Sequence, residues 1–269
     1  MVIEDQQWLL NELHKVEKWE KDQSGLWFWE RLGRLPFKLL DKFTPTFIQN
    51  KIGLLLDELG KYVQTGGSYL SSTSRIPAYY PHHPVETLDD VNQLPISTMD
   101  EAADRLSKGR KKVATVQGAS TGFGGILTLS LDIPLLLGLQ LKTLQDLAIC
   151  YGYDPKNKQE RLFIIKCLQF VSSDIVGKQT ILKQLTAFDQ NGSHERREAM
   201  SELQGWREVV FSYRDNFGWK KLFQMVPIAG LVFGAFINRS AINDIAEAGK
   251  MLYRKRRIVE RFQMCEGEA

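Results

Sequence analysis

The chain has 269 residues, of which 43% are hydrophobic and 25% charged, and its formal net charge at pH 7 is +3. This length allows one large domain or two small ones, and the apolar content suffices for a folded core, which argues against wholesale disorder. A net charge this close to zero excludes a global basic field, so no nucleic-acid partner is predicted.

The three cysteines stand apart, at Cys150, Cys167 and Cys265. An odd number without a C-x-x-C pair argues against a disulfide scaffold or a zinc knuckle and fits a reducing compartment. Residues 3–20 show a charged amphipathic pattern rather than the apolar core of a signal peptide. We therefore expect a cytoplasmic protein that holds no metal and no cofactor.

The N-terminal part, residues 1–80, is predicted to be helical and rich in aromatic residues. Apolar residues from Trp8 to Trp19 recur at helical spacing, and residues 46–63 give a second helical pattern. Tryptophans in such helices are typical of core packing. Because Trp also favours the water–lipid boundary, an interfacial anchor is a second interpretation.

Prolines cluster between Pro77 and Pro95, which predicts a proline-rich linker over residues 81–96 and a helical core over residues 97–265. The first core helix is expected to begin with Ser97 or Thr98 as its N-cap. No alternating strand pattern occurs, so the fold class is all-α, a multi-helix bundle. Its predicted helices are 97–112, 134–151, 157–171, 175–188, 194–213 and 241–262.

Two segments of the core carry almost no charge. Residues 113–141 contain a single charged side chain, Asp132, and residues 222–238 contain none. If residues 116–132 form one helix, a polar stripe on it would line a binding groove. The residues of that stripe that we predict as groove residues are Gln117, Thr121, Thr128 and Asp132.

Both segments are also rich in glycine, which disfavours a helix interior unless another helix approaches closely. We predict that the two segments pack on each other. We also predict that the first segment, broken at Asp132 and Pro134, forms a central glycine-rich apolar helical hairpin. The glycines assigned to this packing are Gly118, Gly122, Gly125, Gly230 and Gly234. Spanning a bilayer needs about 20 apolar residues, and Asp132 and Pro134 interrupt the first segment, so a buried or surface-inserting hairpin is favoured over transmembrane helices.

Asp132 has two interpretations. It precedes Pro134 closely, so it is suited to be the N-cap of a helix that begins there. Alternatively, its carboxylate ends the polar stripe and contacts an ion or a substrate in the groove. No second carboxylate stands at a spacing that would form an acid–base pair, and no catalytic residue is assigned.

Two basic clusters lie near the apolar segments. Each is typical of a solvated helix face. Each also suits binding to an anionic membrane surface, where the attraction is worth about 1 kcal/mol for each basic residue. The residues predicted for membrane contact are Arg110, Lys111, Lys112, Arg254, Lys255, Arg256 and Arg257.

Two motifs imitate known sites without the required context. Residues 113–124 resemble the glycine-rich phosphate turn of dinucleotide-binding folds, but more than a hundred residues precede them and a helical pattern follows. His82, His83 and Glu86 lie in a proline-rich loop at spacings that match no defined metal site. Neither a dinucleotide nor a metal is therefore predicted.

Several ordered motifs resemble the signature of the EcsC protein family. They are Gly118–Gly125, Asp132–Pro134, Leu139–Leu141 and Tyr151–Pro155, followed by Pro227, Gly230, Gly234, Asn238, Ala246 and the arginine-rich end. The resemblance covers residues 95–265 and implies a bacterial all-helical protein that assists membrane export. It implies no catalytic residue.

The leading functional hypothesis is a non-enzymatic, membrane-associated helical protein at the inner face of the cell membrane, whose partner is the membrane surface or a membrane protein. One alternative is an enzyme with a lipid-facing cleft around Asp132. The other is a soluble structural module that buries both apolar segments in its own core. The sequence predicts neither a ligand nor an oligomeric state.

Overall fold

The computed structural model describes residues 4–23, 71–122, 126–173, 175–190 and 227–267. Helices joined by short turns make up these residues, with no strand among them, which confirms the predicted all-α bundle. In chain order the elements are α1 (Gln6–Gln23), the 3-10 helix η1 (Thr73–Arg75), α5 (Ile76–Tyr79), α6 (Leu88–Asn92), α7 (Ile96–Gly122), α8 (Ile126–Cys150), α9 (Lys158–Ser172), α10 (Ile175–Gln190) and α12 (Pro227–Gly267).

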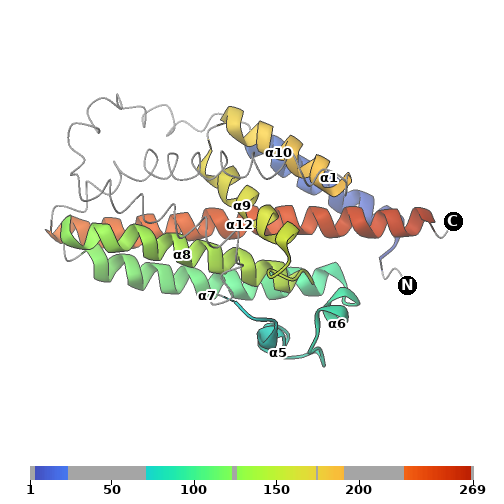
Figure 1. Cartoon of the computed structure of the whole chain (residues 1–269), viewed down its shortest axis with the longest axis horizontal. Coiled ribbons are helices and arrows are strands. Elements are labelled where there is room, and N and C mark those ends of the chain that lie inside the picture. Colours follow the sequence, from blue (N-terminus) through green and yellow to red (C-terminus); the bar gives the residue numbers. More distant parts are fainter. Residues whose placement is uncertain (1–3, 24–70, 123–125, 174, 191–226, 268–269) are drawn as a thin grey trace.

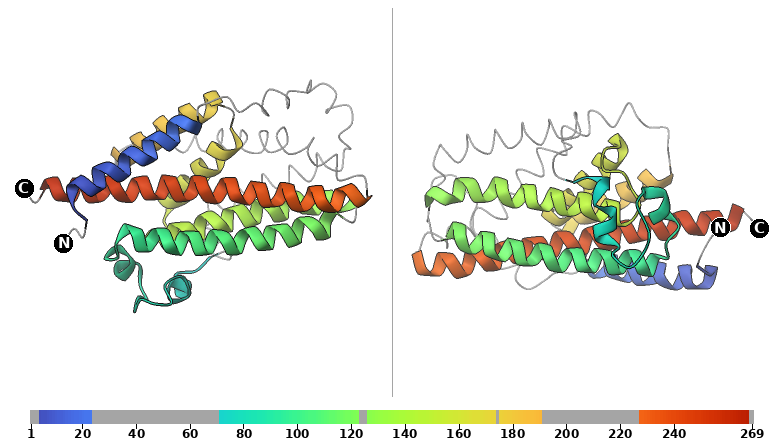
Figure 2. Two further views of the ribbon diagram at one scale, coloured as in Figure 1. Left: turned by 180° about the vertical axis from the view of Figure 1, so that it is seen from behind. Right: turned by 90° about the horizontal axis from the view of Figure 1, so that it is seen from below.

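Three long helices, α7, α8 and α12, lie side by side along the length of the molecule (Figures 1 and 2). At 1.5 Å per residue, α12 is about 60 Å long. We predicted a boundary between residues 238 and 241, but the helix continues through Arg239 and Ser240. Neither residue is a proline or a glycine, so no helix-breaking residue ends the helix there.

The first apolar segment folds back on itself, though not at the predicted place. Helix α7 continues to Gly122, and α8 begins at Ile126 and runs through Pro134 without a break. The predicted N-cap role of Asp132 is therefore wrong, because the helix has already begun at Ile126. The two helices are antiparallel neighbours (Figure 1), and α7 and α8 replace the single helix expected over residues 116–132.

One continuous hydrophobic core lies between α5, α7, α8, α9, α10 and α12. Its largest fully buried side chains include Tyr80, Tyr151, Tyr253, Phe163 and Phe170. A smaller cluster of Leu9, Val16, Ile96 and Ile258 attaches α1 to α7 and α12. The N-terminal helix is thus packed on the C-terminal helix (Figure 2).

Close approach of two helices occurs at a glycine that the sequence analysis did not select. A β-carbon on Gly249 of α12 would lie 2.8 Å from methyl groups of Leu144 and Leu147 of α8. This contact lets the two long helices approach more closely than larger residues would permit. Gly138, in contrast, has open space around it.

The predicted linker is folded onto the core. Helix α6 begins with a capping box in which Thr87 and Asp90 bond each other's backbone N–H groups. Val85 and Val91 are buried. The residues between Tyr80 and Ile96 therefore contribute to the hydrophobic core as well as connecting helices.

Helix α7 is capped from a distance. It begins at Ile96, so Ser97 and Thr98 lie inside its first turn rather than at the N-cap. The backbone N–H of Ile96 donates instead to the carboxylate of Glu4, at 2.6 Å. A carboxylate at a helix N-terminus is favourable because it satisfies a free N–H group and complements the helix dipole.

The end predicted for the 134–151 helix is confirmed, because α8 ends at Cys150 and Gly152 follows as its C-terminal cap. Gly152 has φ +78°, the N–H of Tyr153 donates to the carbonyl of Ala148 at 2.9 Å, and that of Gly152 donates to Ile149 at 3.0 Å. These bonds form a Schellman motif, which ends α8. Helices α9 and α10 confirm two further predictions, whereas the helices predicted over 46–63 and 194–213 lie outside the described residues.

No helix in the described ranges is both long and apolar enough to cross a bilayer.

Replacing Gly152 with alanine should destabilise the fold. The left-handed backbone is unfavourable for alanine, and its β-carbon would lie 1.9 Å from Asn92 Oδ1, so we expect a loss of about 1–3 kcal/mol in unfolding free energy. Urea unfolding measures this change. Gly138→Ala is the matched control, because a helical glycine with open space should gain about 0.5–1 kcal/mol. Equal effects at both positions would contradict the assignment.

Candidate functional site

The basic end of α12 is enclosed by carboxylates from other helices. Arg254 pairs with Glu12 of α1 and with Asp100 of α7, the latter at 2.8 Å. Lys255 pairs with Glu20 at 2.8 Å. Further pairs join Arg256 to Glu160 at 2.7 Å, Lys250 to Asp104 at 2.7 Å, and Arg261 to Glu4.

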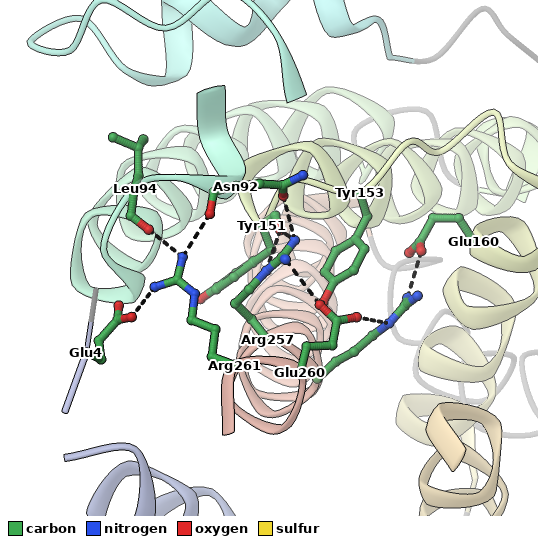
Figure 3. A network of polar contacts seen from close by, with 10 residues as sticks. Glu4, Asn92, Leu94, Tyr151, Tyr153, Glu160, Arg257, Glu260 and Arg261 are labelled. Atoms are coloured by element: carbon green, nitrogen blue, oxygen red, sulfur yellow. Dashed lines mark hydrogen bonds and ion pairs between the residues drawn. The ribbon is translucent and has the colours of Figure 1, made fainter. Parts of the chain in front are cut away.

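Arg256 and Arg257 contact the turn that follows α8 (Figure 3). Arg257 Nε donates to the carbonyl oxygen of Tyr151 at 3.1 Å, and its Nη2 donates to Asn92 Oδ1 at 2.9 Å. The guanidinium carbons of Arg256 and Arg257 lie 4.1 and 4.4 Å from the centre of the Tyr153 ring. Arg261 donates to the carbonyl oxygens of Asn92 and Leu94. This network fixes the C-terminal half of α12 to α6, α7 and α9.

The predicted membrane-contact residues on α12 are therefore largely covered by the protein. Their side chains are 12%, 19%, 15% and 8% exposed, for Arg254, Lys255, Arg256 and Arg257 respectively. Each is paired with a carboxylate, so they do not form an exposed basic face. Arg257 pairs with Glu260 of the same helix, whereas the acids that pair with the other three include residues far away in the sequence.

Glu160 shows the cost of this arrangement. Burial raises the pKa of Glu160, against the opposing effects of the Arg256 charge and of hydrogen bonds from Tyr253 and Arg256. Tyr253 donates to Glu160 at 2.5 Å. A carboxylate this deeply buried needs these partners to remain charged, so the network primarily stabilises the fold.

A second polar cluster lies between α5, α7 and α8. The carboxylate of Asp146 is fully buried and accepts hydrogen bonds from Ser71 at 2.5 Å and from Tyr79 at 2.7 Å. Arg110 of α7 also donates to it. Lys142, one turn before Asp146 on α8, lies 3.9 Å from the carboxylate and 3.3 Å from Ser71 Oγ.

The environment of this cluster affects its acids and bases. Burial lowers the pKa of Lys142, and the charges of Arg110 and Arg75 lower it further against the opposing effect of Asp146. Burial and the Asp146 charge raise the pKa of Tyr79, which keeps its hydroxyl a donor. We call Asp146, Arg110, Lys142, Tyr79 and Ser71 the Asp146 cluster.

The sequence analysis missed this cluster. Lys142 and Asp146 were visible as an i, i+4 pair of opposite charge on an otherwise apolar helix. That signal alone suggests an exposed pair. Only packing of Ser71 and Tyr79 against α8 makes the pair a buried site.

The predicted groove residues are divided between two helices. Gln117 and Thr121 lie on α7, whereas Thr128 and Asp132 lie on the antiparallel α8, so they do not form a stripe on one helix. Gln117 is partly buried. The side chains of Thr121, Thr128 and Asp132 lie outside the described residues, and the groove stays a prediction.

The predicted packing glycines are only partly placed. Gly118 is buried on α7. Gly122 lies at the end of α7, and Gly230 and Gly234 lie near the start of α12, but their surroundings are outside the described part, and Gly125 lies outside it entirely. The glycine packing of the two apolar segments stays a prediction.

No group of three or more metal-binding side chains occurs among the described residues. In the proline-rich loop, Asp90 is engaged in the α6 capping box, and a backbone hydrogen bond from Glu86 and bonds from Thr87 lower its pKa. Cys150 is fully buried, and burial raises the pKa of its thiol, as expected for a core cysteine rather than a nucleophile.

One face of α7 near Gly122 combines basic and apolar residues that reach solvent. Lys108, Lys112 and Val116 follow one another at helical spacing and are exposed, as is Val113. From the first predicted basic cluster, Lys112 belongs to this face, Lys111 is partly buried, and Arg110 is held by Asp146. We call Lys108, Lys112, Val113 and Val116 the exposed α7 face.

Most of the chain matches the profile of one protein family. The profile of the EcsC protein family matches residues 10–258. This chain belongs to the EcsC protein family. The match begins within α1, well before the expected start at residue 95, so the family region includes both the N-terminal helix and the long helix α12 on which it packs.

Two relatives from Bacillus subtilis (strain 168) are similar to the chain. The uncharacterized protein YdbA is 56% identical over 272 residues, which cover 100% of this chain and 99% of YdbA. Protein EcsC is 30% identical over 171 residues, which cover 64% of this chain and 69% of that protein. No solved structure matches the chain.

The motif Tyr151–Pro155, which carried the resemblance to the EcsC family, has a structural role. Tyr151 donates to Asp100 at 2.6 Å and its ring stacks on Tyr253, while Tyr153 donates to Glu260 at 2.9 Å. These contacts connect α7, the end of α8 and α12. The motif therefore positions helices.

Attachment of α1 to α12 should depend on the charge of Glu12. Burial raises the pKa of Glu12, but hydrogen bonds from Lys15 and Arg254 outweigh it and hold the pKa below its usual value. Such a carboxylate stabilises the fold above its unfolded pKa, and its contribution is lost as pH falls through the folded pKa. We expect Glu12→Gln to lower the unfolding free energy at pH 7 by about 1–3 kcal/mol.

This deficit should shrink as the pH falls below about 4.3, the pKa of an unfolded glutamate, and through the lower pKa of the folded carboxyl, where the wild-type side chain also takes up its proton. Glu101→Gln is the control, because Glu101 is 71% exposed and 3.7 Å from Arg105, so its loss should be under about 1 kcal/mol. A Glu12→Gln deficit that is independent of pH would contradict this role.

Proposed function

We propose that this EcsC-family protein is a non-enzymatic, membrane-associated helical protein that binds the inner surface of the cell membrane through the exposed α7 face. The observation that carries the proposal is the combination of Lys108 and Lys112 with Val113 and Val116 on one solvent-facing side of a helix. Val113 and Val116 are 50% and 70% exposed. Helices that lie on a membrane pair basic residues with apolar ones in this way.

Neighbouring helices add apolar surface at the same end of the bundle. Leu135 of α8 and Phe236 of α12 are 52% and 69% exposed. Leu135 lies in the first half of α8 and Phe236 in the first half of α12. These halves lie beside the C-terminal half of α7 (Figure 1). Exposed apolar side chains gathered at one end support contact with lipid or with an apolar partner.

The two kinds of residue have different tasks in this proposal. Each lysine near an anionic surface contributes about 1 kcal/mol of attraction, which salt weakens. Burial of a Phe or Val side chain in the interface contributes about 1.5–3 kcal/mol and does not depend on salt in this way. A role in assisting membrane export rests on the family resemblance alone.

Flotation of the purified protein with vesicles tests the proposal. We expect flotation with phosphatidylglycerol-containing vesicles, less with phosphatidylcholine vesicles, and partial survival of binding at high salt. Val116→Asp and Phe236→Asp should each reduce the floated fraction at least about tenfold, because they replace apolar burial with a charge.

Met264→Asp is the matched control. Met264 is 57% exposed on the same helix as Phe236, and at 1.5 Å per residue it lies about 42 Å away along the helix axis. This variant should float like the wild type. Absence of flotation with either vesicle, or equal losses in all three variants, would overturn the proposal.

A further inference from the structure

The Asp146 cluster carries more positive than negative charge. Arg110 and Lys142 both face the carboxylate of Asp146, and within the described ranges neither has a second carboxylate at ion-pair distance. One buried carboxylate therefore serves two cations. Most basic residues of this protein that are as well covered, such as Arg254, have at least one carboxylate each.

Arg75 adds a third cation to the same place. Its guanidinium carbon lies 5.7 Å from the centre of the Tyr79 ring, and the Tyr79 hydroxyl donates to Asp146. Arg75 is exposed and forms no ion pair with any part of the chain that the structure describes. Among the described residues, three positive charges thus lie around one negative charge, which leaves an excess of two.

Hydroxyl groups lie beside these cations. Residues 71–74 read Ser-Ser-Thr-Ser and precede Arg75 directly. Ser71 Oγ is 3.3 Å from Lys142 Nζ, and the hydroxyls of Ser72 and Ser74 are 2.9 Å apart. Ser71 already donates its one hydroxyl proton to Asp146, whereas the hydroxyls of Ser72 and Ser74 can rotate to donate to an oxyanion, so these two serines offer adaptable donors next to Arg75 in the chain.

We propose that Arg75, Lys142 and the hydroxyls of Ser72 and Ser74 bind a phosphate group. A phosphate monoester carries a charge of about −1.5 to −2 at pH 7, which matches the excess of two. Arg75 is exposed and the Lys142 side chain is 23% exposed, so both reach solvent. The Arg110 side chain is 14% exposed, so it is less accessible than Lys142, and it adds positive charge to the site.

Asp146 has a positioning role in this site. It is fully buried and holds Ser71, Tyr79, Arg110 and Lys142 in one arrangement. Without it, the repulsion between Arg110 and Lys142 would have no internal compensation. Because Asp146 neutralises only one of the charges, the site remains attractive to an anion.

The phosphate group could come from a lipid headgroup or from a soluble phosphate compound, and both present the same chemistry to the site. The site is separate from the exposed α7 face and does not depend on the proposed membrane binding. Binding of inorganic phosphate in solution therefore tests the site alone, and vesicles of equal charge distinguish the two sources.

Calorimetric titration with inorganic phosphate at low salt is the first test. We expect saturable binding by the wild-type protein that Arg75→Gln and Lys142→Gln each weaken about tenfold, because each removes a charge-assisted hydrogen bond. Lys158→Gln is the control, since Lys158 is an exposed lysine at the start of α9, and it should bind like the wild type. Arg75 is exposed and lies over the edge of the core at the Tyr79 ring, so its variant should fold normally.

Vesicles containing phosphatidic acid or phosphatidylglycerol, matched in surface charge, identify the source. A preference for phosphatidic acid that Arg75→Gln abolishes would indicate a lipid phosphomonoester, whereas phosphate binding without that preference would indicate a soluble compound. Val116→Asp should weaken vesicle binding but leave phosphate binding intact. Absence of saturable phosphate binding, or binding that neither Arg75→Gln nor Lys142→Gln weakens, would overturn the proposal.

Discussion

The structure depends on the insertion of Arg257 at the carboxyl end of α8. This guanidinium group, on a side chain that is 8% exposed, donates to the carbonyl of Tyr151 and to Asn92, and it stacks on Tyr153. A buried guanidinium is unfavourable unless its donors are satisfied, so this position requires the turn and α6 to be where they are. Because Gly152 has no side chain, Asn92 and Arg257 can approach the backbone of this turn.

The same requirement extends along α12. Its remaining basic residues recruit carboxylates from α1, α7 and α9, which places the two ends of the chain side by side. Glu4 contacts both α12 and α7, since it pairs with Arg261 and also accepts a hydrogen bond from the first N–H of α7. Ion pairs of the C-terminal half of α12 therefore fix the positions of the neighbouring helices. The EcsC-family motif around Tyr151 contacts the same half of α12.

The opposite end of the bundle has a different character. There α7 presents lysines and valines to solvent, and exposed Leu135 and Phe236 lie on the adjoining helices. Two basic clusters that look alike in sequence thus have different surroundings, because one meets internal carboxylates and part of the other reaches water. Between these ends, the Asp146 cluster holds an incompletely neutralised group of cations. This division locates the proposed membrane contacts at the opposite end of the bundle from the arginine network that stabilises the fold.

The sequence by itself determined the all-α class, the end of α8 at Gly152 and the positions of α9 and α10, because helix periodicity and a C-cap glycine are local signals. It also carried the ordered motifs of the EcsC family. It could not determine that α7 is capped by Glu4, that α8 runs through Pro134, or that Arg254 to Arg257 are largely covered. The cap of α7 and the pairing of Arg254 to Arg256 depend on partners far away in the chain. Tertiary structure decided them because the charge of a side chain is encoded locally, whereas its neutralisation depends on which helices pack together.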